Sequence, residues 1–243
     1  MIRGIERLAK DMTVKMMRQE AVANNLANAT TSGYKTQRPF VTVLQNAVGS
    51  TQPAGQSQVT GLYTDFTEGP IDSTERPLDF AIEGDGFFVI DTPQGLRYTR
   101  NGNFTLSEDG TLVTQAGYRV MGSGGPITIN SQNNTDNITM TAEGLIYSGS
   151  DQVGALKIVT FDNPEALVSE GNMFASPSGE GRQCDMKTTQ VIQGALERSN
   201  VSPVDQMVEM ITVGRGFETD QKSIMVQDDS AKQLIDRAGK MGA

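Results

Sequence analysis

The sequence predicts an α+β protein. We expect N- and C-terminal α-helices to pair as a coiled coil, with a central, mainly antiparallel β domain of barrel or sandwich type between them. Apolar residues recur at helical spacing at both ends of the chain. Between these ends, short apolar runs alternate with turn residues about every eight to twelve positions, which is typical of antiparallel sheets. The 243 residues are enough to bury a core.

The first helix is expected to run from Ile2 to Asn28. Its predicted apolar stripe consists of Ile5, Leu8, Met12, Met16, Ala23 and Leu26. Asn24, Asn25 and Asn28 then compete with the helix for backbone hydrogen bonds, and Gly33 permits a turn. We predict a buried polar network that fixes the next segment. A plain helix stop is the alternative.

Residues 36–75 predict an extended arm or hairpin. Apolar residues gather at Phe40–Leu44 and Leu62–Phe66, and the stretch around Gly49–Gln58 is rich in Gln and Ser. Such a segment buries little apolar surface by itself. We therefore expect it to be partly disordered until it meets a neighbouring molecule.

The β domain is expected to begin near Arg76. Phe87–Ile90 predicts a buried strand, with Leu96–Thr99 as its partner. Asn101-Gly102 and Asp109-Gly110 predict hairpin turns on either side of Phe104–Leu106. Further strands are expected at Thr111–Thr114, Tyr118–Met121, Ile127–Ile129, Ile138–Met140, Gly144–Tyr147 and Ala155–Phe161.

The second helix has a clear start. Ser202 can cap it, Pro203 suits its first position, and Asp205 favours the positive end of the helix. It should run to about Lys240. Its apolar stripe consists of Val204, Met207, Ile211, Ile224, Ala231, Leu234, Ala238 and Met241. Gly214 and Gly216 each cost about 1 kcal/mol relative to Ala, which indicates either a close approach of another backbone or a local kink.

Composition excludes several classes of function. The net charge of −9 and the lack of a long basic run argue against nucleic acid as a partner. The chain has no histidine, which removes Ser-His-Asp and Cys-His catalysis and His-ligated zinc. Cys184 is the single cysteine, so no disulfide forms within the chain, and we expect it to be an unreactive bystander.

Targeting signals are also absent from the sequence. The first twenty residues contain eight charged side chains, so they do not form a secretory signal peptide. No run of about 18 apolar residues predicts a membrane span. By these rules the protein is cytoplasmic, or it is exported by a route without a cleaved signal.

Two candidate sites have simpler structural explanations. Glu83, Asp85 and Asp91 could form a carboxylate pair for glycoside hydrolysis, but Gly84-Asp85-Gly86 is better explained as a tight turn. Asn133–Asn137 offers oxygen ligands for Ca²⁺ without the spacing of an EF-hand, so a surface loop is preferred. We therefore expect no catalytic residue, no cofactor and no metal.

Motifs lie at both ends and in the middle of the chain. The N-terminal motif is Ala23–Asn28 with Gly33-Tyr34-Lys35. The C-terminal motif consists of Ala195–Val201, Met207–Ile211 and Arg215–Glu218. The middle motifs are Arg76–Ala81, Gly86–Phe88, Tyr98–Gly102 and Gly124–Thr128. Together they resemble the motifs of the flagellar rod and hook family. One departure is Asp220, where the family pattern leads us to expect Asn.

The resemblance implies a structural, non-enzymatic subunit of the flagellar drive shaft. It also implies periplasmic helical assembly with copies of itself and with other rod subunits, proximal and distal. Export through the flagellar type III apparatus would account for the missing signal peptide, and peptidoglycan-side or ring components are further candidate partners. Neither nucleic acid nor a membrane span is implied.

The expected division of the chain assigns residues 1–35 and 186–243 to the inner helical coiled coil, 36–75 to the arm and 76–185 to the outer β domain. The alternative function is a carbohydrate-active enzyme or adhesin that uses the β domain. The predicted assembly interface consists of Ile5, Leu8, Met12, Met16, Ala23, Asn24, Asn25, Leu26, Asn28, Gly33, Tyr34, Leu196, Asn200, Val204, Met207, Ile211, Gly214, Phe217, Ile224 and Leu234.

Overall fold

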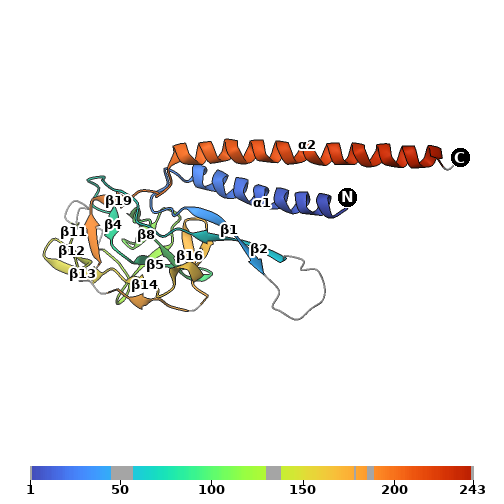
Figure 1. Cartoon of the computed structure of the whole chain (residues 1–243). Coiled ribbons are helices and arrows are strands. Elements are labelled where there is room, and N and C mark those ends of the chain that lie inside the picture. Colours follow the sequence, from blue (N-terminus) through green and yellow to red (C-terminus); the bar gives the residue numbers. More distant parts are fainter. Residues whose placement is uncertain (1, 45–56, 130–137, 178, 185–188, 242–243) are drawn as a thin grey trace. The chain divides into compact units, whose positions relative to one another are not determined.

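The computed structural model describes residues 2–44, 57–129, 138–177, 179–184 and 189–241 (Figure 1). Its contacts divide the chain into two compact units. The helical unit contains Met1–Ala27, Gln37–Tyr63 and Ser202–Ala243, and the β unit contains Asn28–Thr36 and Thr64–Val201. The structure contains two terminal helices and a large antiparallel β part. This confirms the predicted α+β class with helices at both ends and an antiparallel β domain between them.

The helical unit is built on α1 (Ile2–Ala27) and α2 (Pro203–Met241), close to their predicted bounds. Asn25 contacts Gln206, and Lys15 contacts Asp220, so the two helices run antiparallel. Ser202 caps α2 as predicted, since its Oγ accepts a hydrogen bond from Asp205 N at 3.4 Å.

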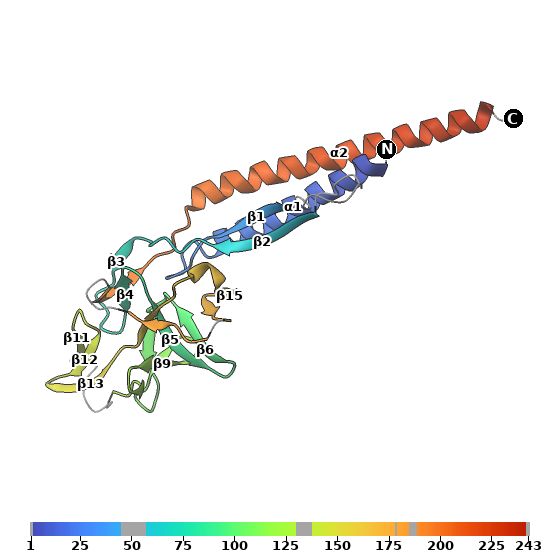
Figure 2. The same cartoon turned by 60° about the horizontal axis from the view of Figure 1, so that its bottom comes forward.

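The strands β1 (Gln37–Leu44) and β2 (Ser57–Thr64) pair as a two-stranded sheet beside α1 (Figure 2). They supply the two strands of the predicted hairpin. Most of the Gln- and Ser-rich stretch between them lies outside the described residues.

The β unit is organised around one large antiparallel sheet that curls into a half-barrel. Its main strand order is β15-β16-β6-β5-β9-β8-β7, and β10, β14 and β17 pair off this path. The strands are β5 (Phe87–Thr92), β6 (Gly95–Thr99), β7 (Phe104–Leu106), β8 (Leu112–Thr114), β9 (Arg119–Gly122), β10 (Gly125–Pro126), β14 (Ile158–Thr160), β15 (Val168–Glu170), β16 (Met173–Ala175) and β17 (Arg182–Gln183). A short 3₁₀ helix, Pro164–Ala166, precedes β15.

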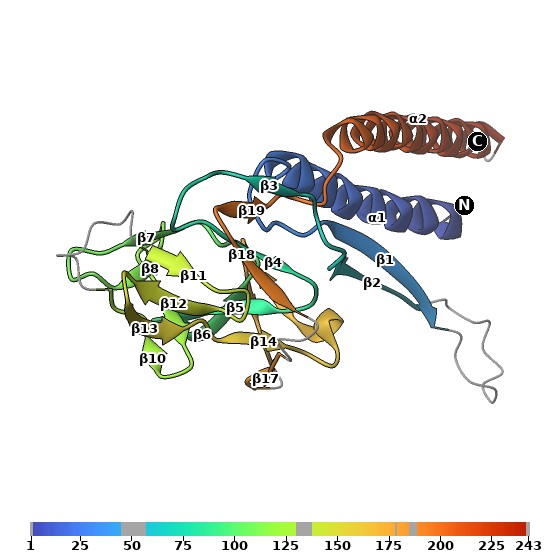
Figure 3. The same cartoon turned by 90° about the vertical axis from the view of Figure 1, so that its left-hand side faces the viewer.

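Smaller sheets complete the β unit (Figure 3). Strands β11 (Ile138–Met140), β12 (Leu145–Ser148) and β13 (Asp151–Ala155) form one of them. In the other two, β18 (Gln190–Gln193) pairs with β4 (Phe80–Glu83), and β19 (Ala195–Glu197) pairs with β3 (Ile71–Ser73). Strand β19 ends only a few residues before α2 begins.

The core of the β unit consists of two clusters, and successive side chains of β5 belong to them in turn. Phe88 and Ile90 belong to the larger cluster, and Phe87 and Val89 belong to the smaller one. Successive side chains of a strand point to opposite faces, so both faces of β5 are buried. Burial on both faces explains why this strand is a continuous apolar run in the sequence.

The prediction of a hairpin at Asn101-Gly102 is wrong. Strands β6 and β7 on either side of it are separated in the sheet by β5, β9 and β8. Gly102 instead allows the backbone of Phe80 to come close, because a Cβ at position 102 would lie 1.7 Å from the carbonyl oxygen of Phe80. The Asp109-Gly110 hairpin between β7 and β8 is confirmed.

Two other strand predictions need correction. Ile127–Ile129 is extended, and its backbone is bonded to Leu112 and Gly110, but only an isolated bridge forms there instead of a ladder. The predicted strand Ala155–Phe161 is divided between the end of β13 and β14. In both places the chain changes its pairing partner, which breaks the regular register.

The glycine turn between β4 and β5 is confirmed. Gly84 and Gly86 both adopt positive φ, and a Cβ on Gly86 would lie 2.7 Å from Ile158 Cγ2. Cys184 is buried beside this turn, and burial raises the pKa of its thiol. The candidate Ca²⁺ loop Asn133–Asn137 lies outside the described residues.

Within the described residues, neither long helix carries an apolar stretch of the length that a bilayer crossing requires.

Candidate functional site

The loop that follows α1 is folded into the β unit through Gly33. Its amide donates a hydrogen bond to the Glu197 carbonyl oxygen at 2.8 Å. Gly33 has φ +68°, and a Cβ would lie 2.3 Å from Asn101 N. Only glycine tolerates both conditions. Gly33 of the N-terminal motif therefore lies directly against Glu197 of the C-terminal motif.

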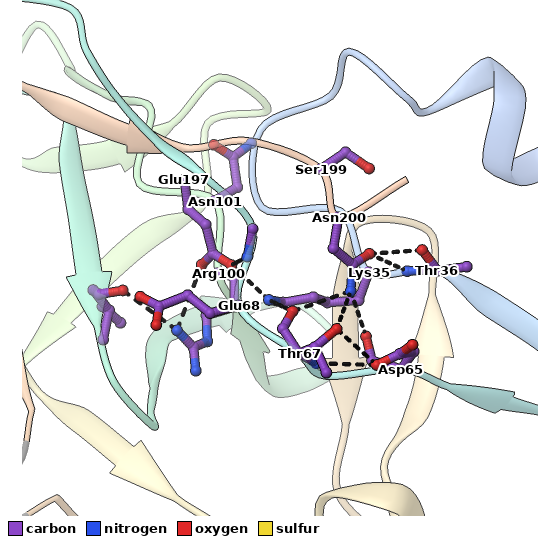
Figure 4. A network of polar contacts seen from close by, with 12 residues as sticks. Lys35, Thr36, Asp65, Thr67, Glu68, Arg100, Asn101, Glu197, Ser199 and Asn200 are labelled. Atoms are coloured by element: carbon purple, nitrogen blue, oxygen red, sulfur yellow. Dashed lines mark hydrogen bonds and ion pairs between the residues drawn. The ribbon is translucent and has the colours of Figure 1, made fainter. Parts of the chain in front are cut away.

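An ion pair between Lys35 and Glu197 lies at the centre of this region (Figure 4). Lys35 Nζ is 2.5 Å from Glu197 Oε1, and neither side chain is exposed to solvent. The ammonium also donates to the Thr67 carbonyl oxygen at 2.7 Å, while Gly69 N donates to Glu197 Oε1 at 2.9 Å. Each buried charge thus has an ionic partner and a backbone partner.

Arg100 adds a second cation to the same carboxylate. Its Nη1 lies 3.4 Å from Glu197 Oε2 and 3.4 Å from the Ile82 carbonyl oxygen. The guanidinium lies over the Phe87 ring, 5.3 Å from the ring centroid. Burial lowers the pKa of Lys35, and Arg100 lowers it further, while Glu197 opposes both.

Asn200 uses one amide side chain to hold three segments. Its Oδ1 accepts hydrogen bonds from Thr36 N at 2.8 Å and Thr36 Oγ1 at 2.7 Å. Its Nδ2 donates to the carbonyl oxygens of Asp65 at 2.9 Å and Thr67 at 3.0 Å. A carboxylate could not replace it, because it has no donor.

We call Lys35, Thr36, Arg100, Glu197 and Asn200 the Lys35–Glu197 network. It joins the segment after α1, the segment before α2 and the segment after β2 inside the β unit. Its cations and carboxylate are bound to one another and shielded from water. The arrangement can fix chain segments, and it has no free nucleophile or exposed acid for catalysis.

The helical unit has a polar contact of its own at Asn25, which is 2% exposed. Its Nδ2 donates to the Gln37 carbonyl oxygen at 2.8 Å and to Gln206 Oε1 at 3.2 Å, and its Oδ1 accepts from Gln37 N at 2.9 Å. For Asn25, the predicted buried network that fixes the next segment is confirmed.

A second helical contact explains Asp220. Lys15 Nζ lies 2.5 Å from Asp220 Oδ2 and donates to the Gly216 carbonyl oxygen at 3.2 Å. A Cβ on Gly216 would come within 3.3 Å of Lys15 Cε. Gly216 therefore leaves room for the lysine stem, and Asp220 supplies a carboxylate for its charge.

Comparison with known proteins matches these same regions to three family models. They are "Flagella basal body rod protein" at residues 16–35, "Flagellar hook protein FlgE/F/G D1 domain" at 81–148 and "Flagellar basal body rod FlgEFG protein C-terminal" at 192–237. A "Flagellar basal-body rod protein FlgF" of Caulobacter vibrioides is 32% identical over 240 residues, which covers 96% of each chain. The chain belongs to the flagellar basal-body rod protein family.

Other rod proteins are similar over nearly the whole chain. A FlgG of Bacillus subtilis is 34% identical, covering 89% of this chain and 91% of its own. A FlgF of Salmonella typhimurium is 34% identical, covering 90% and 93%. The motifs Arg76–Asp79 and Ser202–Asp205 predict a rod protein of the FlgF type with FlgG as the close competitor, and both names occur among the relatives.

Rod-family membership indicates a structural protein rather than an enzyme. The rival hypothesis of a carbohydrate-active enzyme requires a cleft with two carboxylates. A surface hollow of about 370 Å³ does contain Asp162 and Glu180. However, Asp162 lies 3.7 Å from Arg182, Glu180 lies 3.1 Å from Lys157, and both acids are well exposed. Neither is the desolvated acid that glycoside hydrolysis uses.

The predicted interface residues divide between buried and exposed positions. Buried ones are Asn25, Gly33, Tyr34 and Leu196; half-buried ones are Leu8, Met12, Leu26, Asn28, Asn200, Gly214, Phe217 and Ile224; exposed ones are Met16, Ala23, Asn24, Val204, Met207 and Ile211. The side chains of Ile5 and Leu234 lie outside the described residues.

The apolar pattern of α2 therefore belongs to two different faces of the helix. Val213 is buried, and Gln206, Gly216 and Asp220 lie on the same face towards α1. The opposite face exposes large apolar side chains, namely Val204, Met207, Val208, Ile211, Met225 and Val226. We call these six residues the outer stripe of α2.

Sequence reasoning missed the charged partners in both units. Lys35, Arg100 and Glu197 all fall inside the motifs that carry the family resemblance, yet each one taken alone is typical of a solvent-exposed position. Lys15 and Asp220 have the same character.

Proposed function

We propose that this protein is an axial subunit of the bacterial flagellar rod and that it polymerises helically as part of the shaft that transmits motor torque to the hook and filament. The observation that carries the proposal is the outer stripe of α2. Valine, methionine and isoleucine side chains on it are between 52% and 69% exposed, although α1 already covers the other face of the helix. Exposed apolar patches of this kind mark protein interfaces.

The two helices are proposed to wind as a coiled coil that forms the inner tube together with neighbouring subunits. Their antiparallel contact and the pairs Asn25–Gln206 and Lys15–Asp220 support this arrangement. A heterologous contact that does not close on itself generates a helical tube from one kind of subunit.

The predicted division of labour completes this proposal. Residues 1–35 with 186–243 act as the inner helical part, 36–75 as a bracing arm and 76–185 as the outer β part. Before assembly the isolated helices gain little from burial, so they are poorly ordered. A loosely ordered chain suits export through the flagellar type III apparatus into the periplasm without a cleaved signal.

The proposed partners are copies of this chain, other rod subunits of the proximal and distal types, and the export apparatus. Ring or peptidoglycan-side components of the basal body are further candidates. The names of the relatives place those proteins in the basal body, which supports the same location here.

Swimming of a strain that lacks its own copy of this subunit tests the proposal. The wild-type chain should restore swimming, whereas Ile211→Asp and Leu8→Asp should abolish it, because a buried charge prevents helix packing. Thr212→Asp is the control, since Thr212 is exposed on α2 and lies about 100° around the helix from Ile211, so the same charge is added outside the outer stripe. Normal swimming of Ile211→Asp would refute an interface on this face.

A further inference from the structure

The outer stripe of α2 has a charged band in its middle. Val204, Met207, Val208 and Ile211 lie on one side of the band, and Met225 and Val226 lie on the other. Between them, the same helical face presents Arg215, Glu218 and Lys222, all exposed. The band carries two positive charges and one negative charge. A partner for this face must therefore offer apolar contact at both ends and an acid near the middle.

The outer face of α1 has the complementary pattern. Lys15 and Asn25 point towards α2. The opposite face exposes mostly small or apolar side chains, namely Ala9, Thr13, Met16, Glu20, Ala23 and Ala27. Glu20 is the only charged residue among these six, and it lies between Met16 and Ala23.

We infer that the outer stripe of α2 docks on the outer face of α1 in a second copy of this chain. The inference rests on the proposed function and names the contact between subunits. Bulky side chains of α2 meet small side chains of α1, so the helices can approach closely. Glu20 of one copy then faces the Arg215–Lys222 band of the next, which fixes their axial register.

This contact is heterologous. The surface that each copy presents on α2 differs from the surface that it presents on α1, so one copy can contact two others. Repetition then gives an open helical array instead of a closed dimer. Within one chain Glu20 points away from α2, so a Glu20–Arg215 attraction acts only between molecules.

Disulfide trapping between two full-length versions of the chain tests the inference. Both carry Cys184→Ala and different tags; one carries Ala23→Cys and the other Ile211→Cys. Oxidised basal bodies from swimming cells should contain the mixed-tag disulfide at more than tenfold the yield of either same-residue disulfide. Thr212→Cys in place of Ile211→Cys is the matched control, and it should give little product with Ala23→Cys.

Three results would overturn the inference. They are a dominant Ile211→Cys homodimer, trapping of a different rod protein, and no disulfide in cells that swim normally. Failure of the wild-type chain to restore swimming would instead reject the proposed function itself, so the two failures are distinguishable.

Charge exchange gives a second readout. Glu20→Arg and Arg215→Glu should each reduce the swimming radius severalfold, and the double variant should recover most of it, because Glu20 lies opposite Arg215 in the register that places Ala23 opposite Ile211. Lys10→Glu changes an exposed charge outside this face of α1 and should have no effect. A double variant no better than the weaker single variant would contradict the predicted pairing.

Discussion

Lys35 and Glu197 are 162 positions apart in the sequence, yet their side chains meet at 2.5 Å with no exposure to solvent. One residue ends the N-terminal motif of the family, and the other belongs to its C-terminal motif. The buried pair therefore gives these two motifs a common physical role. They hold the segments next to both helices on one β framework.

Removal of one charge from this pair should be strongly destabilising. Glu197→Gln leaves Lys35 and Arg100 as buried cations without a carboxylate, and we expect the free energy of unfolding to fall by about 3–5 kcal/mol. Urea unfolding followed by tyrosine signals of the β unit measures this change. The double variant Lys35→Met/Glu197→Gln should lose less than the sum of the single variants, because both charges are gone. Additive losses would show that the pair is not coupled.

Gly33→Ala should cost more than a left-handed backbone conformation alone explains. A non-glycine residue at positive φ costs about 1–2 kcal/mol, and here a Cβ would also clash with the Asn101 backbone. Gly171→Ala is the matched control, because Gly171 has φ +67° and nothing lies within 4 Å of its added Cβ. Thermal unfolding of both variants measures the difference. Equal losses would remove the argument for close approach.

Stability should respond to the titration of Lys35. Burial lowers the pKa of this lysine below its ordinary value of 10.5, so the unfolded chain binds the proton more tightly than the folded chain. The buried charge therefore lowers the free energy of unfolding at neutral pH. This loss becomes smaller as pH rises from the lowered pKa of Lys35 towards 10.5.

The comparison for this titration is the double variant Lys35→Met/Glu197→Gln. The wild type should gain stability relative to it as pH rises towards 10.5, the ordinary pKa of a lysine. Urea unfolding at several pH values provides the measurement. A difference that stays constant or falls with pH would contradict the lowered pKa.

Asp220→Asn should weaken the contact between the two helices modestly. The Lys15 and Asp220 side chains are 30% and 14% exposed, so solvent screens part of their attraction. We expect a loss of about 1 kcal/mol that becomes smaller at high salt. Helical circular dichroism during thermal unfolding of the assembled protein reports it. Asp228→Asn is the control, since its ion pair with Lys232 is more than 60% exposed on both sides and should matter less.

The sequence predicted the helices and most strands because their patterns are local. Both helix bounds, the strand Phe87–Thr92 and the Asp109-Gly110 turn follow from periodicity and turn chemistry within a few residues. The Asn101-Gly102 prediction was wrong because the same dipeptide also suits a close backbone approach. Only the position of Phe80, about twenty residues earlier, decides between the two.

The site was only partly predictable for the same reason. Asn25 attracts attention as an amide beside apolar residues, and it makes the expected buried contacts. Asn200 was predicted only as an interface residue, and its hydrogen bonds to Thr36 lie within the chain. Lys35 and Glu197 are ordinary surface residues by type, and their burial depends on a partner far away in the chain. The apolar residues of α2 were predicted as one stripe, but they belong to two faces of the helix, because a long helix can pack on both sides.

The division of the chain has a mechanical consequence. The polypeptide passes from one compact unit to the other at 27/28, 36/37, 63/64 and 201/202. Four covalent bridges link the units, so rotation about any one bond cannot turn one unit freely against the other. A twisting load is shared among these four connections. Cutting the chain at one of them should therefore lower the resistance of the linkage to twisting, and the other three still prevent free rotation of one unit against the other.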